Sequence, residues 1–145
     1  MDATDQRIID QLRDNARAGY AEIGDVVGLS ASAVKRRVDR LVETGAIRGF
    51  TVHIDPAAEG IGVEAYVELY CRGTVAPEEL RALLQAVPEV VYAGTVSGQA
   101  DAIVHMRASS IQALEAALER VRTAPNVDHT RSSIMLSRLI HRRIL

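Results

Sequence analysis

The sequence predicts an α+β protein with two domains, a helical one followed by one in which strands and helices alternate. Apolar residues recur at helical spacing through residues 1–44, whereas strict two-residue alternation begins at Val63. The segment 55–62 lies between the two patterns and holds the first proline of the chain and two glycines. We therefore expect a domain over 1–54, a linker over 55–62 and a second domain over 63–137.

The first predicted helix covers residues 6–17, with its N-cap at Thr4 or Asp5. Its core face is an apolar set: Ile8, Ile9 and Leu12. A short second helix over 20–27 presents another apolar set to the core: Ile23, Val26 and Val27. Residues 28–29 then form a tight link to a third helix. Helix, short turn with glycine and helix together predict a helix-turn-helix.

The third helix is predicted over 30–44, capped by Ser30 and stopped by Gly45. Its buried stripe is aliphatic: Val34, Val38, Leu41 and Val42. The opposite side carries small residues first and cations afterwards. This order suits a helix that enters the major groove, because short side chains allow close approach to base edges and arginines reach guanine or phosphate oxygens. The predicted DNA-binding residues are Ser30, Ser32, Ala33, Lys35, Arg36, Arg37, Arg40 and Arg48.

Within this set we expect Ser32, Ala33 and Arg36 to lie nearest the bases, while the remaining cations contact phosphates. Residues 47–54 alternate and are rich in β-formers, so they predict a strand that packs beside the third helix. Such a strand is a wing. The first domain, 1–54, is therefore predicted to be a winged helix-turn-helix that binds double-stranded DNA.

The second domain begins with a predicted strand over 63–71, in which apolar residues occupy one face. Pro77 suits the first turn of a helix with an apolar stripe, and Pro88 ends that helix. Strands over 90–97 and 101–108 follow, joined by a short turn that contains glycine. These two strands are expected to form a hairpin.

We expect Ile103 and Val104 to point inward from the second strand of the hairpin. Ser109 and Gln112 have the spacing of a capping box and open another helix. The core face of that helix is predicted to be Ile111, Leu114, Leu118 and Val121. A last strand over 127–137 completes the order strand, helix, strand, strand, helix, strand. That order is the ferredoxin-like βαββαβ arrangement.

In such a domain both helices cover one face of the sheet, so the other face is open. Here that face mixes tyrosines and glutamates with apolar residues. Exposed apolar patches usually mark contacts between proteins. We therefore expect a homodimer that forms through the second domain.

The net charge of −2 hides an uneven distribution of charge along the chain. Residues 30–48 carry a net charge of +3, whereas residues 59–128 carry −5. The only other basic segment begins at Arg131 and runs into a basic C-terminal tail, 138–145, in which arginines meet no acid. Polyanion binding is therefore predicted for the third helix and not for the middle of the chain.

Other features exclude whole classes of function. The N-terminus does not resemble a signal peptide and no apolar run is long enough to span a bilayer, so we expect a cytoplasmic protein that contacts no membrane. The single cysteine, Cys71, excludes an internal disulfide. The four histidines lack metal-ligand spacing, and His105 and His129 are expected to face each other on neighbouring strands. We expect no catalytic residues, metal or cofactor.

Four runs of residues are specific when taken together: Gly28-Leu29-Ser30, Arg36-Arg37-Val38-Asp39-Arg40-Leu41, Gly45-Ala46-Ile47-Arg48-Gly49-Phe50 and Asp55-Pro56. In these runs the chain resembles the Lrp/AsnC (feast/famine) family of prokaryotic transcription regulators, and the resemblance extends over essentially its whole length. The resemblance implies a winged helix-turn-helix joined to an effector domain called RAM. It also implies dimers that often assemble into octamers, and small effectors, usually amino acids, that bind between dimers.

The run 97–101 stands where this family has its Gly-x-x-Asp hairpin. Gly98 would let backbone N–H groups approach a ligand carboxylate, and Asp101 would hold an α-ammonium group. The segment 126–130 is expected to line the same pocket from another subunit. The resulting effector-binding set is Ser97, Gly98, Gln99, Ala100, Asp101, Asp128 and His129. Ala100 departs from the aromatic residue common in the family, which leaves the ligand open, and the alternative is that Gly98 and Asp101 serve only the turn.

Two other functions stay open at this point. Siroheme decarboxylases resemble this family and keep its two-domain outline, but such an enzyme has no need of arginines opposite the buried stripe of the third helix. An architectural protein that coats DNA would rely on phosphate contacts alone and would bind with a steep dependence on salt. The prediction favoured by the residues is a sequence-specific regulator that responds to an amino acid.

Overall fold

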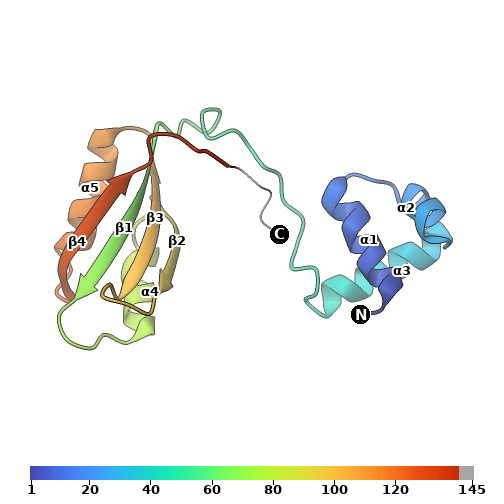
Figure 1. The fold of residues 1–145 in the computed structure, drawn as a ribbon, viewed down its shortest axis with the longest axis horizontal. Coiled ribbons are helices and arrows are strands. Elements are labelled where there is room, and N and C mark those ends of the chain that lie inside the picture. Colours follow the sequence, from blue (N-terminus) through green and yellow to red (C-terminus); the bar gives the residue numbers. More distant parts are fainter. Residues whose placement is uncertain (141–145) are drawn as a thin grey trace. The chain divides into compact units, whose positions relative to one another are not determined.

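In the computed structural model of the protein, residues 1–140 are described. The chain divides into two compact units, which meet in sequence between His53 and Ile54. The first unit is helical and the second combines a sheet with helices (Figure 1). Of the predicted basic tail, residues 141–145 lie outside the described part of the chain.

The first unit contains α1 (Ala3–Asp14), α2 (Tyr20–Val27) and α3 (Ala31–Glu43). Its core is aliphatic and is contributed by all three helices: Ile8, Leu12, Ile23, Val27, Val34 and Val38. Three residues predicted for this core lie elsewhere. Ile9 is half-buried, and Val26 and Val42 are 47% and 43% exposed, because each lies at the edge of its helix's apolar stripe.

The first helix begins three residues earlier than predicted, and its N-cap is neither Thr4 nor Asp5. The Asp2 carboxylate accepts the backbone N–H of Asp5 at 2.8 Å, and the Asp5 carboxylate accepts that of Asp2 at 3.0 Å. This reciprocal pair satisfies two backbone donors that the first turn of a helix leaves free. The helix ends at Asp14, three residues before its predicted end at residue 17, and Asn15 is its C-cap.

The turn between α2 and α3 depends on two glycines. Gly28 ends α2 in the left-handed conformation, with φ at 77°. Gly24 is buried inside α2, and a Cβ atom there would lie 2.3 Å from the backbone oxygen of Leu29. Only glycine therefore lets the turn pack this closely on α2. Ser30 caps α3 as predicted and accepts the N–H of Ala33 at 3.3 Å.

The predicted wing is wrong, because residues 47–54 form no strand in the part of the chain that the structure describes. Phe50, Val52 and Ile54 do alternate along this segment, and they are 56%, 77% and 52% exposed. A strand requires a neighbour to pair its backbone groups. Among residues 1–140 no element pairs with this segment, which explains why a β-like sequence remains extended without becoming a strand.

The second unit contains four strands and two helices: β1 (Val63–Cys71), α4 (Pro77–Gln85), β2 (Val90–Thr95), β3 (Ala102–Ala108), α5 (Ile111–Arg122) and β4 (Val127–Ile134). The strands form one antiparallel sheet in the order β2-β3-β1-β4. Both helices lie on the same face of this sheet (Figure 1). The order and the layers confirm the predicted α+β class and its ferredoxin-like second domain.

The strand register decides which side chains reach the core. Val67 pairs with Val104, and both are buried under the helices, whereas Tyr66 pairs with His105 on the open face. Ile103 is consequently on the open face and 36% exposed, which corrects its predicted inward position. Likewise β1 separates β3 from β4, so His105 and His129 are not on neighbouring strands.

The helix α5 also begins differently from the prediction. Its N-cap is Ser110, which accepts the N–H of Ala113 at 3.2 Å, and not Ser109. Ile111 is therefore the first residue of the helix and is 60% exposed instead of buried. The other three predicted core residues of α5 are buried: Leu114, Leu118 and Val121.

Candidate nucleic-acid interface and ligand site

The candidate nucleic-acid interface is the exposed side of α3. Arg36 is exposed there, and neither Arg36 nor Arg48 forms an ion pair with any of residues 1–140. Ser32 is exposed on the first turn, where its hydroxyl lies 3.1 Å from that of Ser30. Short polar groups and an unpaired guanidinium are thus available on the same side of the helix.

Lys35 has a partner within its own helix. Its ammonium nitrogen lies 2.6 Å from Asp39, one turn away, and this hydrogen bond raises the pKa of Lys35. Both side chains are largely exposed, at 61% and 47%. Such a surface pair is weak and can open, so Lys35 remains able to contact a phosphate.

Two other predicted DNA-binding residues, Arg37 and Arg40, turn toward α1. The guanidinium of Arg37 donates to Asp2 and to Asp5, each at 2.7 Å. That of Arg40 donates to both carboxylate oxygens of Asp5, at 3.0 and 3.1 Å. Arg37 is 27% exposed and Arg40 is 55% exposed. Arg40 therefore keeps much of its side chain accessible, whereas Arg37 mainly joins two helices.

Asp5 is the residue that sequence reasoning missed. It is fully buried, and it is the one charged or polar side chain that is buried in the described part of the chain. The hydrogen bond from the Asp2 backbone, helped by the Arg37 guanidinium, outweighs burial and lowers the pKa of Asp5. The signal in the sequence was the pair of aspartates three residues apart at the N-terminus, combined with two arginines three apart on the third helix.

The segment from Arg131 onward contains no acid of its own, but two of its arginines pair with glutamates of β1. Arg131 pairs with Glu68 at 3.6 Å, because the strand register places β4 residue 131 opposite β1 residue 68. Arg138 lies 2.8 Å from Glu64. Of the other two arginines in this segment, Arg142 and Arg143, nothing is described.

The candidate ligand site is an open hollow of about 640 Å³ on the open face of the sheet. Four of the predicted effector-binding residues line it: Ser97, Gly98, Gln99 and Ala100. Tyr70, Ile103 and Arg131 also line it, from β1, β3 and β4. The hollow thus combines a glycine-containing backbone, an aromatic ring and a guanidinium.

Asp101 follows the lining residue Ala100 and forms hydrogen bonds with the protein backbone. Its carboxylate accepts the backbone N–H of Cys71 at 2.7 Å, and its own N–H donates to the carbonyl of Leu69 at 2.9 Å. These bonds attach the hairpin to the end of β1. The hydrogen bond from the Cys71 N–H is accepted by Oδ2 of Asp101 and not by Oδ1.

The last two predicted effector residues, Asp128 and His129, do not line the hollow formed by this copy of the chain. His129 stacks on Tyr70 with ring centroids 4.3 Å apart, and Tyr70 itself lines the hollow. A hydrogen bond between Nδ1 of His129 and the carboxylate of Asp128, at 2.8 Å, lowers the pKa of Asp128. The Tyr70 ring therefore separates His129 and its partner Asp128 from the hollow.

Among residues 1–140, no three histidine, cysteine or acidic side chains gather closely enough to hold a metal ion. None of the described helices combines the length and the apolar character needed to cross a membrane.

Comparisons with known proteins agree with this architecture. Residues 1–42 match the family model described as AsnC-type helix-turn-helix domain, and residues 64–145 match that described as Lrp/AsnC ligand binding domain. The chain is 51% identical to the HTH-type transcriptional regulator Rv2324 of Mycobacterium tuberculosis over 142 residues. That alignment covers 98% of this chain and 96% of the relative.

Two solved structures are similar over nearly the full length. The feast or famine regulatory protein Rv3291c of M. tuberculosis, complexed with L-methionine, superimposes with a TM-score of 0.89 at 33% identity, covering 99% of this chain and 97% of that one. The regulator NMB0573 of Neisseria meningitidis, in a complex with L-Met, gives 0.90 at 25% identity, covering 100% and 96%. The family matches together span most of the chain, and the protein therefore belongs to the Lrp/AsnC family of transcriptional regulators.

Proposed function

We propose that this regulator binds specific sequences of double-stranded DNA as a homodimer and that an amino acid modulates its binding or assembly. The proposed DNA binding rests on the accessibility of Arg36 on α3. Arg36 is exposed and unpaired among residues 1–140, on a helix whose other face is held by the core and by Asp5. A helix that is fixed in orientation and presents an accessible guanidinium is suited to the major groove.

In this proposal Ser32, Ala33 and Arg36 contact base edges, while Ser30, Lys35 and the remaining arginines of the set contact phosphates. Arg37 and Arg40 contribute less than their charge suggests, because both already bind Asp5. The relatives named above are regulators, and we propose no catalytic role for the chain.

The homodimer is proposed to form through the open face of the sheet. Three large side chains are exposed there: Tyr66 at 47%, Tyr92 at 65% and Ile103 at 36%. A face of this kind on a single sheet is typical of a contact surface. A symmetric dimer would then present two copies of α3 to half-sites about one helical turn apart.

Sedimentation equilibrium of the full chain at micromolar concentration tests this assembly. We expect a dimer, or a larger assembly with an even number of chains, because association of two copies would bury the exposed apolar side chains of the open face. A monomer at that concentration would contradict the proposed dimer.

The role of Arg36 is tested by comparing a duplex selected from a random pool with unselected duplexes of equal length. Arg36→Ala is expected to weaken binding to the selected duplex by about 1–3 kcal/mol and to affect random duplexes far less. The matched control is Arg122→Ala, which removes an exposed arginine from α5. Equal losses on both kinds of duplex would instead support a protein that coats DNA without reading its sequence.

The effector is proposed to bind at the hairpin hollow. Backbone N–H groups near Gly98 would receive the carboxylate, and Oδ1 of Asp101 would receive the ammonium group. Two structural neighbours were solved as complexes with L-methionine, which supports an amino acid as the ligand. In the assembled protein, Asp128 and His129 of another copy would complete the pocket.

Isothermal titration with the twenty amino acids, beginning with L-methionine, tests this site. At least one is expected to bind, and Asp101→Asn should weaken that binding at least tenfold, because the ammonium loses its anionic partner while the amide oxygen still accepts the Cys71 N–H. Asp10→Asn, which removes an exposed charge from α1, serves as the control. Absence of heat with all twenty would reject an amino acid as the effector.

A further inference from the structure

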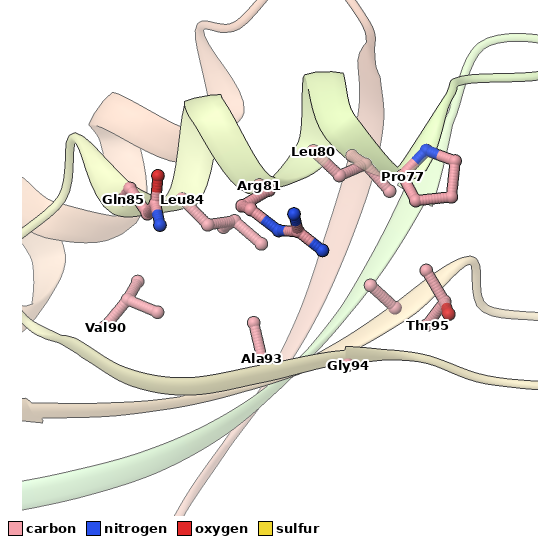
Figure 2. Close-up of a pocket in the computed structure, with 10 residues that line it drawn as sticks. Pro77, Leu80, Arg81, Leu84, Gln85, Val90, Ala93, Gly94 and Thr95 are labelled. Atoms are coloured by element: carbon pink, nitrogen blue, oxygen red, sulfur yellow. The ribbon is translucent and has the colours of Figure 1, made fainter.

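A second cavity of about 430 Å³ lies in the second unit, between α4 and the edge strand β2 (Figure 2). Leu80 and Leu84 of α4 are 5% exposed and form its apolar wall with Ala102, which is 2% exposed. Val90, Ala93 and Thr95 line it from β2. The cavity is separate from the hairpin hollow, since only Thr95 lines both.

The cavity exists because the residues of β2 that face α4 are small. Ala93 pairs with the buried Val104 and Thr95 pairs with the buried Ala102, so both lie on the helix side of the sheet. A protein interior is normally packed as densely as an organic crystal. A larger side chain at position 93 would fill this space, and alanine leaves it open to solvent.

The polar side chains that line the cavity are cationic or neutral, and none is acidic. Figure 2 shows the guanidinium of Arg81 extending from α4 into the space in front of β2. Arg81 is exposed and forms no ion pair with any other described residue. The Gln85 amide and the Thr95 hydroxyl are the neutral polar groups, and no acidic residue lines the cavity.

We propose that this cavity binds a short aliphatic 2-oxo acid, as a ligand site additional to the hairpin hollow. The carboxylate binds the guanidinium of Arg81 with charge-assisted hydrogen bonds. The oxo oxygen accepts a hydrogen bond from Thr95 or Gln85, and the aliphatic tail of the ligand packs against Leu80 and Leu84. The cavity therefore supplies one partner for each part of such a molecule.

Because no acidic residue lines the cavity, we expect it to prefer a 2-oxo acid over the corresponding amino acid. An amino acid that entered the cavity would bring an ammonium group close to the Arg81 guanidinium with no anion in the lining to receive it, and like charges repel each other. A 2-oxo acid of the same carbon skeleton carries only the negative charge. A simple fatty acid would bind Arg81 but would form no hydrogen bond with Gln85 or Thr95, so it would gain less on binding.

Titration of the full chain with 4-methyl-2-oxopentanoate tests the proposal. We expect saturable binding, with at least tenfold weaker binding of 4-methylpentanoate, and L-leucine in excess should not displace the oxo acid. Arg81→Gln should lower the affinity at least tenfold. Ala93→Leu should also abolish binding, because it fills the cavity, and circular dichroism confirms that each variant is folded.

The control variant is Arg131→Gln, which removes a guanidinium from the hairpin hollow and should leave oxo-acid binding unchanged. Absence of binding by the wild type would overturn the proposal. So would binding that survives Arg81→Gln and is lost in Arg131→Gln, or equal affinity for the oxo acid, 4-methylpentanoate and L-leucine. The amino-acid titration at the hairpin is a separate measurement, so failure of one site leaves the other untouched.

Discussion

A single buried carboxylate fixes the helix on which the proposed DNA contacts lie. Asp5 is fully buried, yet it stays charged, because it accepts the Asp2 N–H and the guanidinium groups of Arg37 and Arg40. Burying a charge is costly unless it is paired and hydrogen-bonded, and here both conditions hold. The start of α1 and the middle of α3 are therefore joined by more than apolar packing, and the orientation of α3 depends on this contact.

This contact divides the cations of α3 into two groups. Arg37 and Arg40 bind inward to α1, whereas Arg36 remains accessible. A count of positive charge cannot make this distinction, because it assigns the same role to every arginine on the helix. The second unit shows the same principle on its open sheet face, where Glu64 lies 2.9 Å from His105 and 2.8 Å from Arg138. Much of the charge in this protein is engaged within the chain, and the exposed, unpaired arginines are the informative ones.

The sequence was sufficient to predict the fold wherever local pattern and tertiary contact agree. The alternation of residues 63–71 and the Ser30 cap were predictable, since each depends on neighbouring residues only. The buried position of Asp5 was not predictable, because its two arginine partners lie more than thirty positions away on another helix. The prediction of a strand over 47–54 was wrong for a related reason. An alternating pattern indicates that a segment can pair with a strand, but it does not indicate whether a partner strand is present. The cavity beside Ala93 could not be predicted from the sequence either, since it depends on the register between β2 and β3.

The dependence of stability on pH tests the role of Asp5 most directly. Its pKa is lowered in the folded protein, so its ion pairs stabilise the fold above the ordinary value of 3.8, and that contribution is lost as the pH falls through the lowered pKa. Urea unfolding followed by circular dichroism should show Asp5→Asn less stable than wild type by about 1–3 kcal/mol at pH 7. The difference should shrink in acid, where the wild-type carboxyl is protonated. Equal stability of the two proteins at pH 7 would contradict the account.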